Sequence, residues 1–193
     1  MKRLLITGAA GFIGSNFAHY WCEKYPKDIV VVLDSLTYAG NKNNIKACLE
    51  LPNFEFVKGS VCDDILVDSI FLEYEINLIV HFAAESHVDR SITEPDAFIN
   101  TNILGTHTLL KVAKNRWLDG KVPAHLFHHV STDEVYGSLD PTEPAFKETS
   151  CYAPNSPYAS SKAASDHLVR AYHRTYGLNV TTSNCSNNYG PYH

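Results

Sequence analysis

The sequence lacks the features that would direct it to nucleic acid or to a membrane. Lysine and arginine form no run, and the 193 residues carry a net charge of −5. The sequence therefore offers no cluster of positive charge to which nucleic acid or an anionic membrane surface could bind. No apolar stretch approaches the roughly 20 residues that span a bilayer, and the first apolar run breaks at Thr7 and Gly8. We expect a soluble, cytoplasmic protein.

The sequence also lacks a recognisable metal or disulfide framework. Its five cysteines are odd in number, and no pair has CxxC spacing. His128 and His129 are adjacent on an expected strand, where their side chains point to opposite faces and cannot share an ion. We predict no metal, and free, buried thiols at Cys22, Cys48, Cys62, Cys151 and Cys185.

Short buried-strand patterns alternate with amphipathic helix patterns along the chain, which is 45% hydrophobic and 19% charged. This alternation predicts an α/β fold with a doubly wound parallel sheet. The expected strands are 4–7, 29–33, 54–57, 78–82, 124–131 and 180–185. The expected helices are 15–21, 64–74, 96–114 and 161–176. Residues 85–91 and 140–157 read as polar loops.

A glycine triplet, Gly8, Gly11 and Gly14, follows the first expected strand and opens a helix. In that context the first glycine permits a tight turn, the second lets a pyrophosphate approach the helix N-terminus, and the third lets the helix pack closely. Asp34 ends the second strand, where a carboxylate can accept hydrogen bonds from an adenosine ribose and repel a 2′-phosphate. A strand, a glycine loop and an acidic second strand end are together typical of the NAD-binding Rossmann fold, and Asp34 favours NAD over NADP as the cofactor.

Tyr158 and Lys162 are four residues apart at the start of a helix, so they share one face. A neighbouring ammonium favours the phenolate, and we expect it to lower the pKa of Tyr158. A phenolate is a usable base for removing a hydroxyl proton while hydride leaves the same carbon. The pair therefore predicts hydride-transfer chemistry on an alcohol.

Several segments together resemble the extended short-chain dehydrogenase/reductase family, and within it the 4,6-dehydratases of nucleotide sugars. The matching segments are 8–15, 36–41, 83–92, 131–137, 156–162, 166–170 and 184–192. The resemblance implies an NAD-dependent lyase that converts dTDP-glucose to dTDP-4-keto-6-deoxyglucose in dTDP-rhamnose biosynthesis.

The resemblance also implies roles for five catalytic residues. Tyr158, helped by Thr132 and Lys162, would remove the C4 hydroxyl proton while NAD takes hydride from C4. Glu134 would then remove the C5 proton, and Asp133 would protonate the departing C6 hydroxyl before hydride returns to C6. Asp133 must be protonated to act as the acid while the neighbouring Glu134 is ionised to act as the base, so the pKa of Asp133 is expected to be raised.

Contacts to the cofactor and substrate carry over by position. One departure is Ser60 and Val61, where the family usually has Asp-Ile, so the adenine contact there is expected to be weaker or supplied by the backbone or Asp63. The resemblance assigns the cofactor to Gly8, Gly11, Phe12, Ile13, Gly14, Asp34, Ser35, Leu36, Thr37, Ser60, Val61, Phe82, Ala83, Ala84, Ser86, Thr101, Tyr158, Lys162 and Asn188, and the substrate to Ser86, Thr132 and Asn187.

Family members continue beyond residue 193 into a smaller substrate-binding domain. We therefore expect residues 1–193 to form an NAD-binding domain from a partial or truncated product, with little turnover by itself. The helices 96–114 and 161–176 would form a homodimer interface by resemblance. Three alternatives stay open: a UDP- or GDP-sugar dehydratase, a 4-epimerase or decarboxylase, and an NAD-binding protein without turnover.

Overall fold

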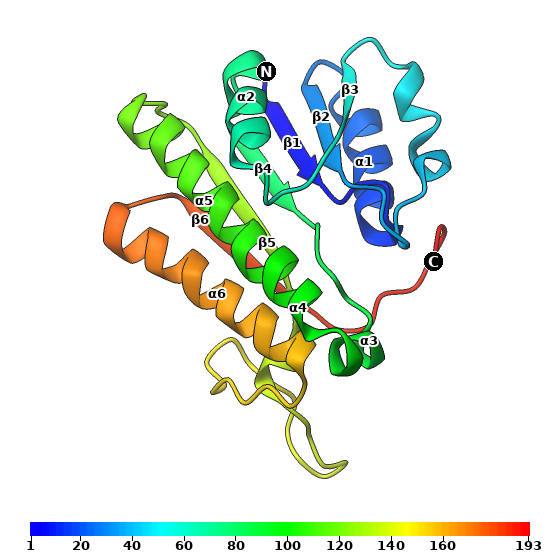
Figure 1. The fold of residues 1–193 in the computed structure, drawn as a ribbon, viewed down its shortest axis with the longest axis vertical. Helices are drawn as coiled ribbons and strands as arrows, with labels where there is room; N and C mark the ends of the chain where they lie inside the picture. Colours follow the sequence, from blue (N-terminus) through cyan, green and yellow to red (C-terminus); the bar gives the residue numbers. More distant parts are fainter.

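Six short strands rich in valine, isoleucine and leucine form one parallel sheet in a computed structural model that describes all residues 1–193 (Figure 1). The strand order is β3-β2-β1-β4-β5-β6, so the chain reverses direction across the sheet between β1 and β4. Ligands of doubly wound sheets bind at the carboxyl ends of the strands beside such a reversal. The strands are β1 Arg3–Thr7, β2 Ile29–Asp34, β3 Phe54–Lys58, β4 Leu78–His81, β5 Leu126–Thr132 and β6 Val180–Cys185.

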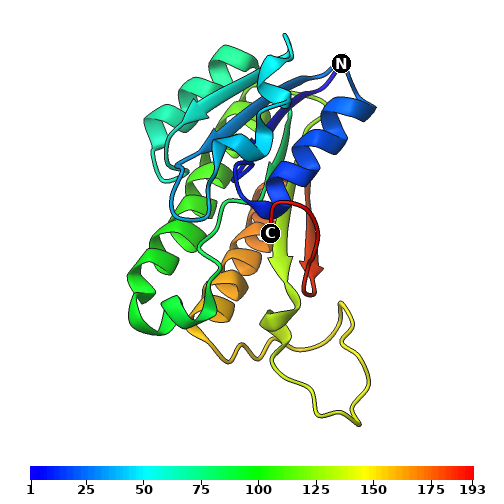
Figure 2. The same cartoon turned by 90° about the vertical axis from the view of Figure 1, so that its right-hand side faces the viewer.

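Helices cover both faces of this sheet, as Figures 1 and 2 show. The helix α5 is flanked by two π-helical turns, Ile99–Gly105 and Asn115–Asp119. Three 3₁₀ turns cover Lys42–Ile45, Cys48–Glu50 and Asp133–Tyr136. The helices are α1 Phe12–Lys24, α2 Asp64–Tyr74, α3 Val88–Thr93, α4 Pro95–Phe98, α5 Thr106–Lys114 and α6 Pro157–Tyr176.

The core has two layers because successive strand residues point to opposite faces of the sheet. Leu5, Ile79 and Phe127 belong to the larger layer, with residues of α2, α5 and α6. Leu4 and Ile6 belong to the smaller layer with α1. This confirms the predicted doubly wound parallel sheet.

Several elements differ from their predicted bounds, among them α1, which covers Phe12–Lys24 rather than 15–21. Helix α6 begins at Pro157 rather than residue 161, because Ser156 Oγ accepts a hydrogen bond from Ala159 N at 3.0 Å and Pro157 suits the first helical turn. The helix expected over 96–114 is a run of α4, α5 and π turns from Pro95 to Asp119. The polar loop expected at 85–91 contains the start of α3, a six-residue helix.

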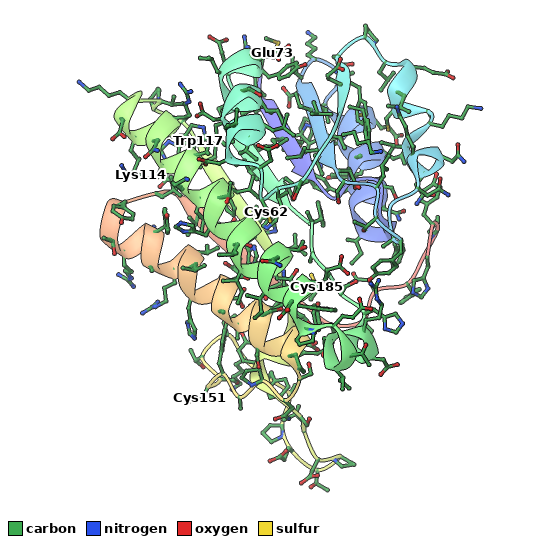
Figure 3. All side chains as sticks on the ribbon, viewed as in Figure 1. Cys62, Glu73, Lys114, Trp117, Cys151 and Cys185 are labelled. Carbon is green, nitrogen blue, oxygen red and sulfur yellow. The ribbon has the colours of Figure 1, made fainter.

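The cysteines are all free, and their burial is only partly as predicted. Cys22 and Cys48 are buried, but Cys62 and Cys151 are exposed and Cys185 is half-buried. Figure 3 places these last three on separate parts of the fold. No helix in the structure has the length and apolar character needed to cross a membrane.

Candidate active site

The glycine loop between β1 and α1 has two glycines that the fold itself requires. Gly8 has a φ of +74°, and a Cβ there would lie 2.6 Å from Ala83 N. A Cβ on Gly14 would lie 2.4 Å from Gly8 O. At Gly11 the nearest atom would be Gly8 O at 3.4 Å, an ordinary contact. The protein therefore tolerates a side chain at Gly11, and the space beside this glycine opens into a cavity.

Asp34 is fixed beside this loop at the end of β2. Its carboxylate is buried, with Oδ2 accepting from Ala10 N at 2.9 Å and Oδ1 accepting from Leu36 N at 2.8 Å. Each oxygen has a second lone pair that can accept from a ligand hydroxyl. The carboxylate is thus oriented by the backbone and lines the same cavity as Gly11.

The cavity has a volume of about 520 Å³ and runs along the carboxyl ends of the strands. Every predicted cofactor, substrate and catalytic residue lines it except Leu36 and Asp133. Leu36 turns with a φ of 54° and contributes its amide to Asp34 instead. Gly40 and Ser131 also line the cavity but were assigned no contact from the sequence, although both lie in segments that resemble the family.

Ser60 and Val61 line the cavity at the position where the family usually has Asp-Ile. Ser60 Oγ accepts from Cys62 N at 3.1 Å, and Val61 is buried. Asp63, the alternative considered for an adenine contact, accepts from Leu66 N at 3.0 Å as the N-cap of α2 and does not line the cavity. Of the residues considered for this contact, Ser60 and Val61 therefore line the cavity and Asp63 does not.

Tyr158 and Lys162 both face the cavity from the first turns of α6. The expectation that the pKa of Tyr158 is lowered is wrong for this structure. Burial and then the charge of Glu134 raise the pKa of Tyr158 to about 12, while the Thr132 hydroxyl acts in the opposite direction. Lys162 Nζ donates to Val130 O at 2.8 Å, so the ammonium is engaged with β5.

Burial also lowers the pKa of Lys162 to about 8, against the opposing charge of Asp166. A lysine with a lowered folded-state pKa binds fewer protons than in the unfolded chain between about pH 8 and 10.5. The free energy of unfolding therefore rises with pH across this window. Below pH 8 the buried ammonium destabilises the fold most.

Replacing Lys162 with methionine is expected to stabilise the fold at pH 7 by about 1–3 kcal/mol, because a buried charge is removed. The advantage over wild type should shrink as pH rises from 8 to 10.5, where the native lysine loses its proton. Urea unfolding at pH 7 and pH 10 measures both values. An advantage that is absent at pH 7, or that grows with pH, would contradict the assignment.

Glu134 and Asp133 lie on the 3₁₀ turn after β5, but they face different spaces. Thr132 Oγ1 accepts from Glu134 N at 3.2 Å and caps this turn. Glu134 lines the main cavity, whereas Asp133 lines a neighbouring hollow of about 440 Å³. Ser186 lines both, so the two spaces adjoin. Of the two carboxylates expected to act on the substrate, only Glu134 therefore lines the main cavity.

Glu134, the carboxylate that lines the main cavity, has a raised pKa. Burial raises it first, and the neighbouring charge of Asp133 raises it further. A carboxyl group with a raised pKa is a stronger base when ionised.

The two adjacent histidines have separate partners. His128 Nδ1 lies 2.9 Å from Thr181 Oγ1 on β6. His129 is fully buried, and its Nε2 lies 3.2 Å from Asp166 Oδ1 on α6. Burial lowers the pKa of His129 to about 4, so this imidazole is neutral near pH 7. Asp166 was not predicted as part of the site, although its four-residue spacing from Lys162 was readable.

Comparison with known proteins gives a consistent set of relatives. A family model described as GDP-mannose 4,6 dehydratase matches residues 5–193. A dTDP-glucose 4,6-dehydratase of Haemophilus influenzae is 51% identical over 195 residues, covering 100% of this chain and 57% of that protein. The chain thus spans little more than half the length of such relatives.

Solved structures agree with the sequence comparison. A dTDP-glucose 4,6-dehydratase of Streptomyces venezuelae with NAD and the ligand TYD bound is 50% identical, with a TM-score of 0.89 over 98% of this chain and 57% of that one. A UDP-glucose 4-epimerase of Thermotoga maritima with UDP-glucose is 30% identical, with a TM-score of 0.84 over 98% of this chain and 57% of the epimerase. The chain belongs to the GDP-mannose 4,6-dehydratase family.

Proposed function

We propose that residues 1–193 are the NAD-binding domain of a dTDP-glucose 4,6-dehydratase and carry its catalytic residues. One observation carries the proposal: Tyr158 and Glu134 line the same cavity as the glycine loop and Asp34. The residues expected to bind the cofactor therefore line the same cavity as two bases, the Tyr158 phenol for the alcohol and the Glu134 carboxylate for a second proton. The relatives that are about half identical to this chain bear that enzyme's name.

The residues of this chain fit NAD. No protein atom near Gly11 would clash with a side chain, so the fold itself does not require a glycine there. A pyrophosphate that approaches the start of α1 would require one. The carboxylate of Asp34 suits an adenosine ribose with a free 2′-hydroxyl and repels a 2′-phosphate. When bound, NAD supplies a hydride acceptor and later a hydride donor.

Tyr158 would act first, by taking the C4 hydroxyl proton of the sugar. With its pKa at about 12 the phenol is protonated in this structure near pH 7, so it must be activated in the bound complex. Two neighbours serve that end. Thr132 lowers the pKa of Tyr158, and Lys162 lies one turn further along α6. Either group stabilises a phenolate once substrate has arrived.

Glu134 would act second, by taking the C5 proton made acidic by a ketone at C4. Its raised pKa brings it closer to neutral pH, which strengthens it as a base while it can still be ionised. Asp133 would give a proton to the C6 hydroxyl as water leaves. It lies in the adjoining hollow, and the substrate must therefore reach across the Ser186 boundary.

Replacing Asp34 with asparagine tests the cofactor assignment. The amide keeps an acceptor for one backbone N–H but removes the charge, so NAD binding is expected to weaken about tenfold while discrimination against NADP falls. Fluorescence titration of the variant and wild type with both cofactors measures the two affinities. Unchanged affinities for NAD and NADP would contradict a ribose contact by Asp34.

The nucleotide of the substrate is the part of the proposal with a specific rival. The matching family model is named for GDP-mannose, whereas the similar relatives are named for dTDP-glucose. An assay of 4-keto sugar formation from dTDP-, UDP- and GDP-hexoses decides between these substrates. A 4-epimerase is disfavoured by Glu134, because epimerisation at C4 needs no base at C5. Absence of any 4-keto product from all three, in an assay of the complete product of the gene that carries this sequence, would reject a dehydratase.

We further propose a homodimer formed through α5 and α6. Ile99 and Leu104, on the helical run that leads into α5, are 46% and 49% exposed. Apolar side chains on a helical surface of this kind suit a second copy of the chain. Sedimentation of the protein at micromolar concentration tests the assembly.

A further inference from the structure

Asp166 lies one helical turn beyond Lys162 and takes no part in the steps proposed above. The residue is 6% exposed. Tyr158, Lys162 and Asp166 are spaced four apart, so they form one stripe along α6. A buried carboxylate is costly unless it is paired and hydrogen-bonded, so its partners indicate what it does.

The partners of Asp166 come from three other parts of the chain. Asp166 Oδ2 accepts from Ser131 Oγ at 2.9 Å, from Tyr152 OH at 2.8 Å and from Asn184 Nδ2 at 3.4 Å. Asp166 Oδ1 lies 3.2 Å from His129 Nε2. One carboxylate therefore joins β5, β6 and the loop before α6 to the helix that carries Tyr158 and Lys162.

These contacts fix the end of β5 on which the reacting groups stand. Ser131 immediately precedes Thr132, and Asn184 Nδ2 also donates to Thr132 O at 3.2 Å. Val130, the residue before Ser131, accepts a hydrogen bond from Lys162 Nζ through its carbonyl oxygen at 2.8 Å. Asp166 thus holds Ser131 directly and the Thr132 carbonyl through Asn184, and Glu134 follows on the capped turn.

Asp166 is also the buried negative charge beside Lys162. Burial raises the pKa of Asp166, but the adjacent His129 and the hydrogen bonds from Ser131 and Tyr152 outweigh this and lower it, so the carboxylate is ionised near pH 7. Its charge raises the pKa of Lys162 against the effect of burial. Other titratable groups lie close enough to Lys162 or Asp166 to interact with their charges. They are Tyr158, His81, His129, Tyr136, Tyr152 and Cys185.

We propose that Asp166 is a positioning residue for the reaction, which holds the Val130–Thr132 backbone and the Lys162 ammonium in register with Tyr158. The inference rests on the proposed function for its kinetic part only. Its electrostatic part concerns the free protein and is measured without substrate. The two parts can therefore fail separately.

The test compares Asp166→Asn with Tyr152→Phe and with the matched control Asp140→Asn. The first removes the charge but keeps the shape, and the second removes one hydrogen bond to Asp166 but keeps the charge. Asp140 is an exposed carboxylate on the loop before α6. The Lys162 signal in protein labelled with ¹³C-lysine is assigned by its loss in Lys162→Met, and its titration is followed together with kcat and KM.

Lys162 is expected to titrate near pH 8 in wild type, Tyr152→Phe and Asp140→Asn, and at clearly lower pH in Asp166→Asn. In dehydration, Asp166→Asn should lower kcat about 10- to 100-fold with KM nearly unchanged, because misplaced groups lose rate rather than binding. Tyr152→Phe should lower kcat several-fold.

An unchanged Lys162 titration in folded Asp166→Asn overturns the inference. Should that variant not fold, Tyr152→Phe decides, and a kcat within twofold of wild type overturns it. The kinetic part uses the complete product of the gene that carries this sequence. If no variant of it, wild type included, dehydrates any nucleotide sugar, the proposed function fails, while the titration still decides the role of Asp166.

Discussion

Glutamine at position 134 is expected to lower the rate of 4-keto sugar formation by about 10²- to 10⁴-fold, the usual effect of removing a general base. Glu134 lines the cavity with Tyr158, and burial gives it a raised pKa. The amide has nearly the same shape but cannot take the C5 proton. Oxidation at C4 does not need this base, so the variant should still reduce its cofactor on adding substrate.

The measurement follows reduced-cofactor absorbance and product in the same sample, because only the two together locate the blocked step. Asp133→Asn is the companion variant. It removes the proton donor for C6 but leaves the C5 base, so C5 of recovered substrate should still exchange with solvent deuterium. Exchange at C5 that persists in Glu134→Gln would show that another group is the base.

The two glycines Gly11 and Gly14 are expected to respond in opposite ways to alanine. At Gly14 the new Cβ would meet Gly8 O at 2.4 Å, and backbone atoms cannot move aside cheaply. Such overpacking costs about 1–3 kcal/mol, which for a chain of this size lowers Tm by about 2–12 °C. At Gly11 no protein atom is closer than 3.4 Å, so Tm should stay within about 2 °C.

The effect on NAD binding is expected to be the reverse, with the large loss of affinity in Gly11→Ala. The methyl group of Gly11→Ala occupies cavity space where a pyrophosphate would approach α1, so affinity should fall at least tenfold without loss of stability. Calorimetric unfolding and NAD titration of both variants provide the comparison. Normal NAD affinity in Gly11→Ala would mean that the cofactor does not pass this glycine.

Much of the fold was readable from the sequence because local patterns and tertiary structure agree. The run 29–33 is apolar and mostly β-branched, and it forms most of β2, a strand buried on both faces. The glycine triplet predicted a turn whose steric demands at Gly8 and Gly14 the structure confirms. Helix bounds were less accurate where capping decides them, as at Ser156.

The electrostatics of the site could not be read in the same way. The spacing of Tyr158 and Lys162 predicts proximity, but the pKa values depend on burial and on Glu134 and Asp166. Burial is set by packing between α6 and β5, which no short pattern records. Asp133 and Glu134 are neighbours in sequence, yet on a 3₁₀ turn they face different spaces.

The central claim is that this cavity joins oxidation at C4 to loss of water across C5 and C6. It is tested most directly with dTDP-glucose carrying deuterium at C4, given to the product of the gene that carries this sequence. The account predicts a 4-keto-6-deoxy sugar with the deuterium at C6. Recovery of a C4 epimer that keeps deuterium at C4, with no label at C6, would contradict it.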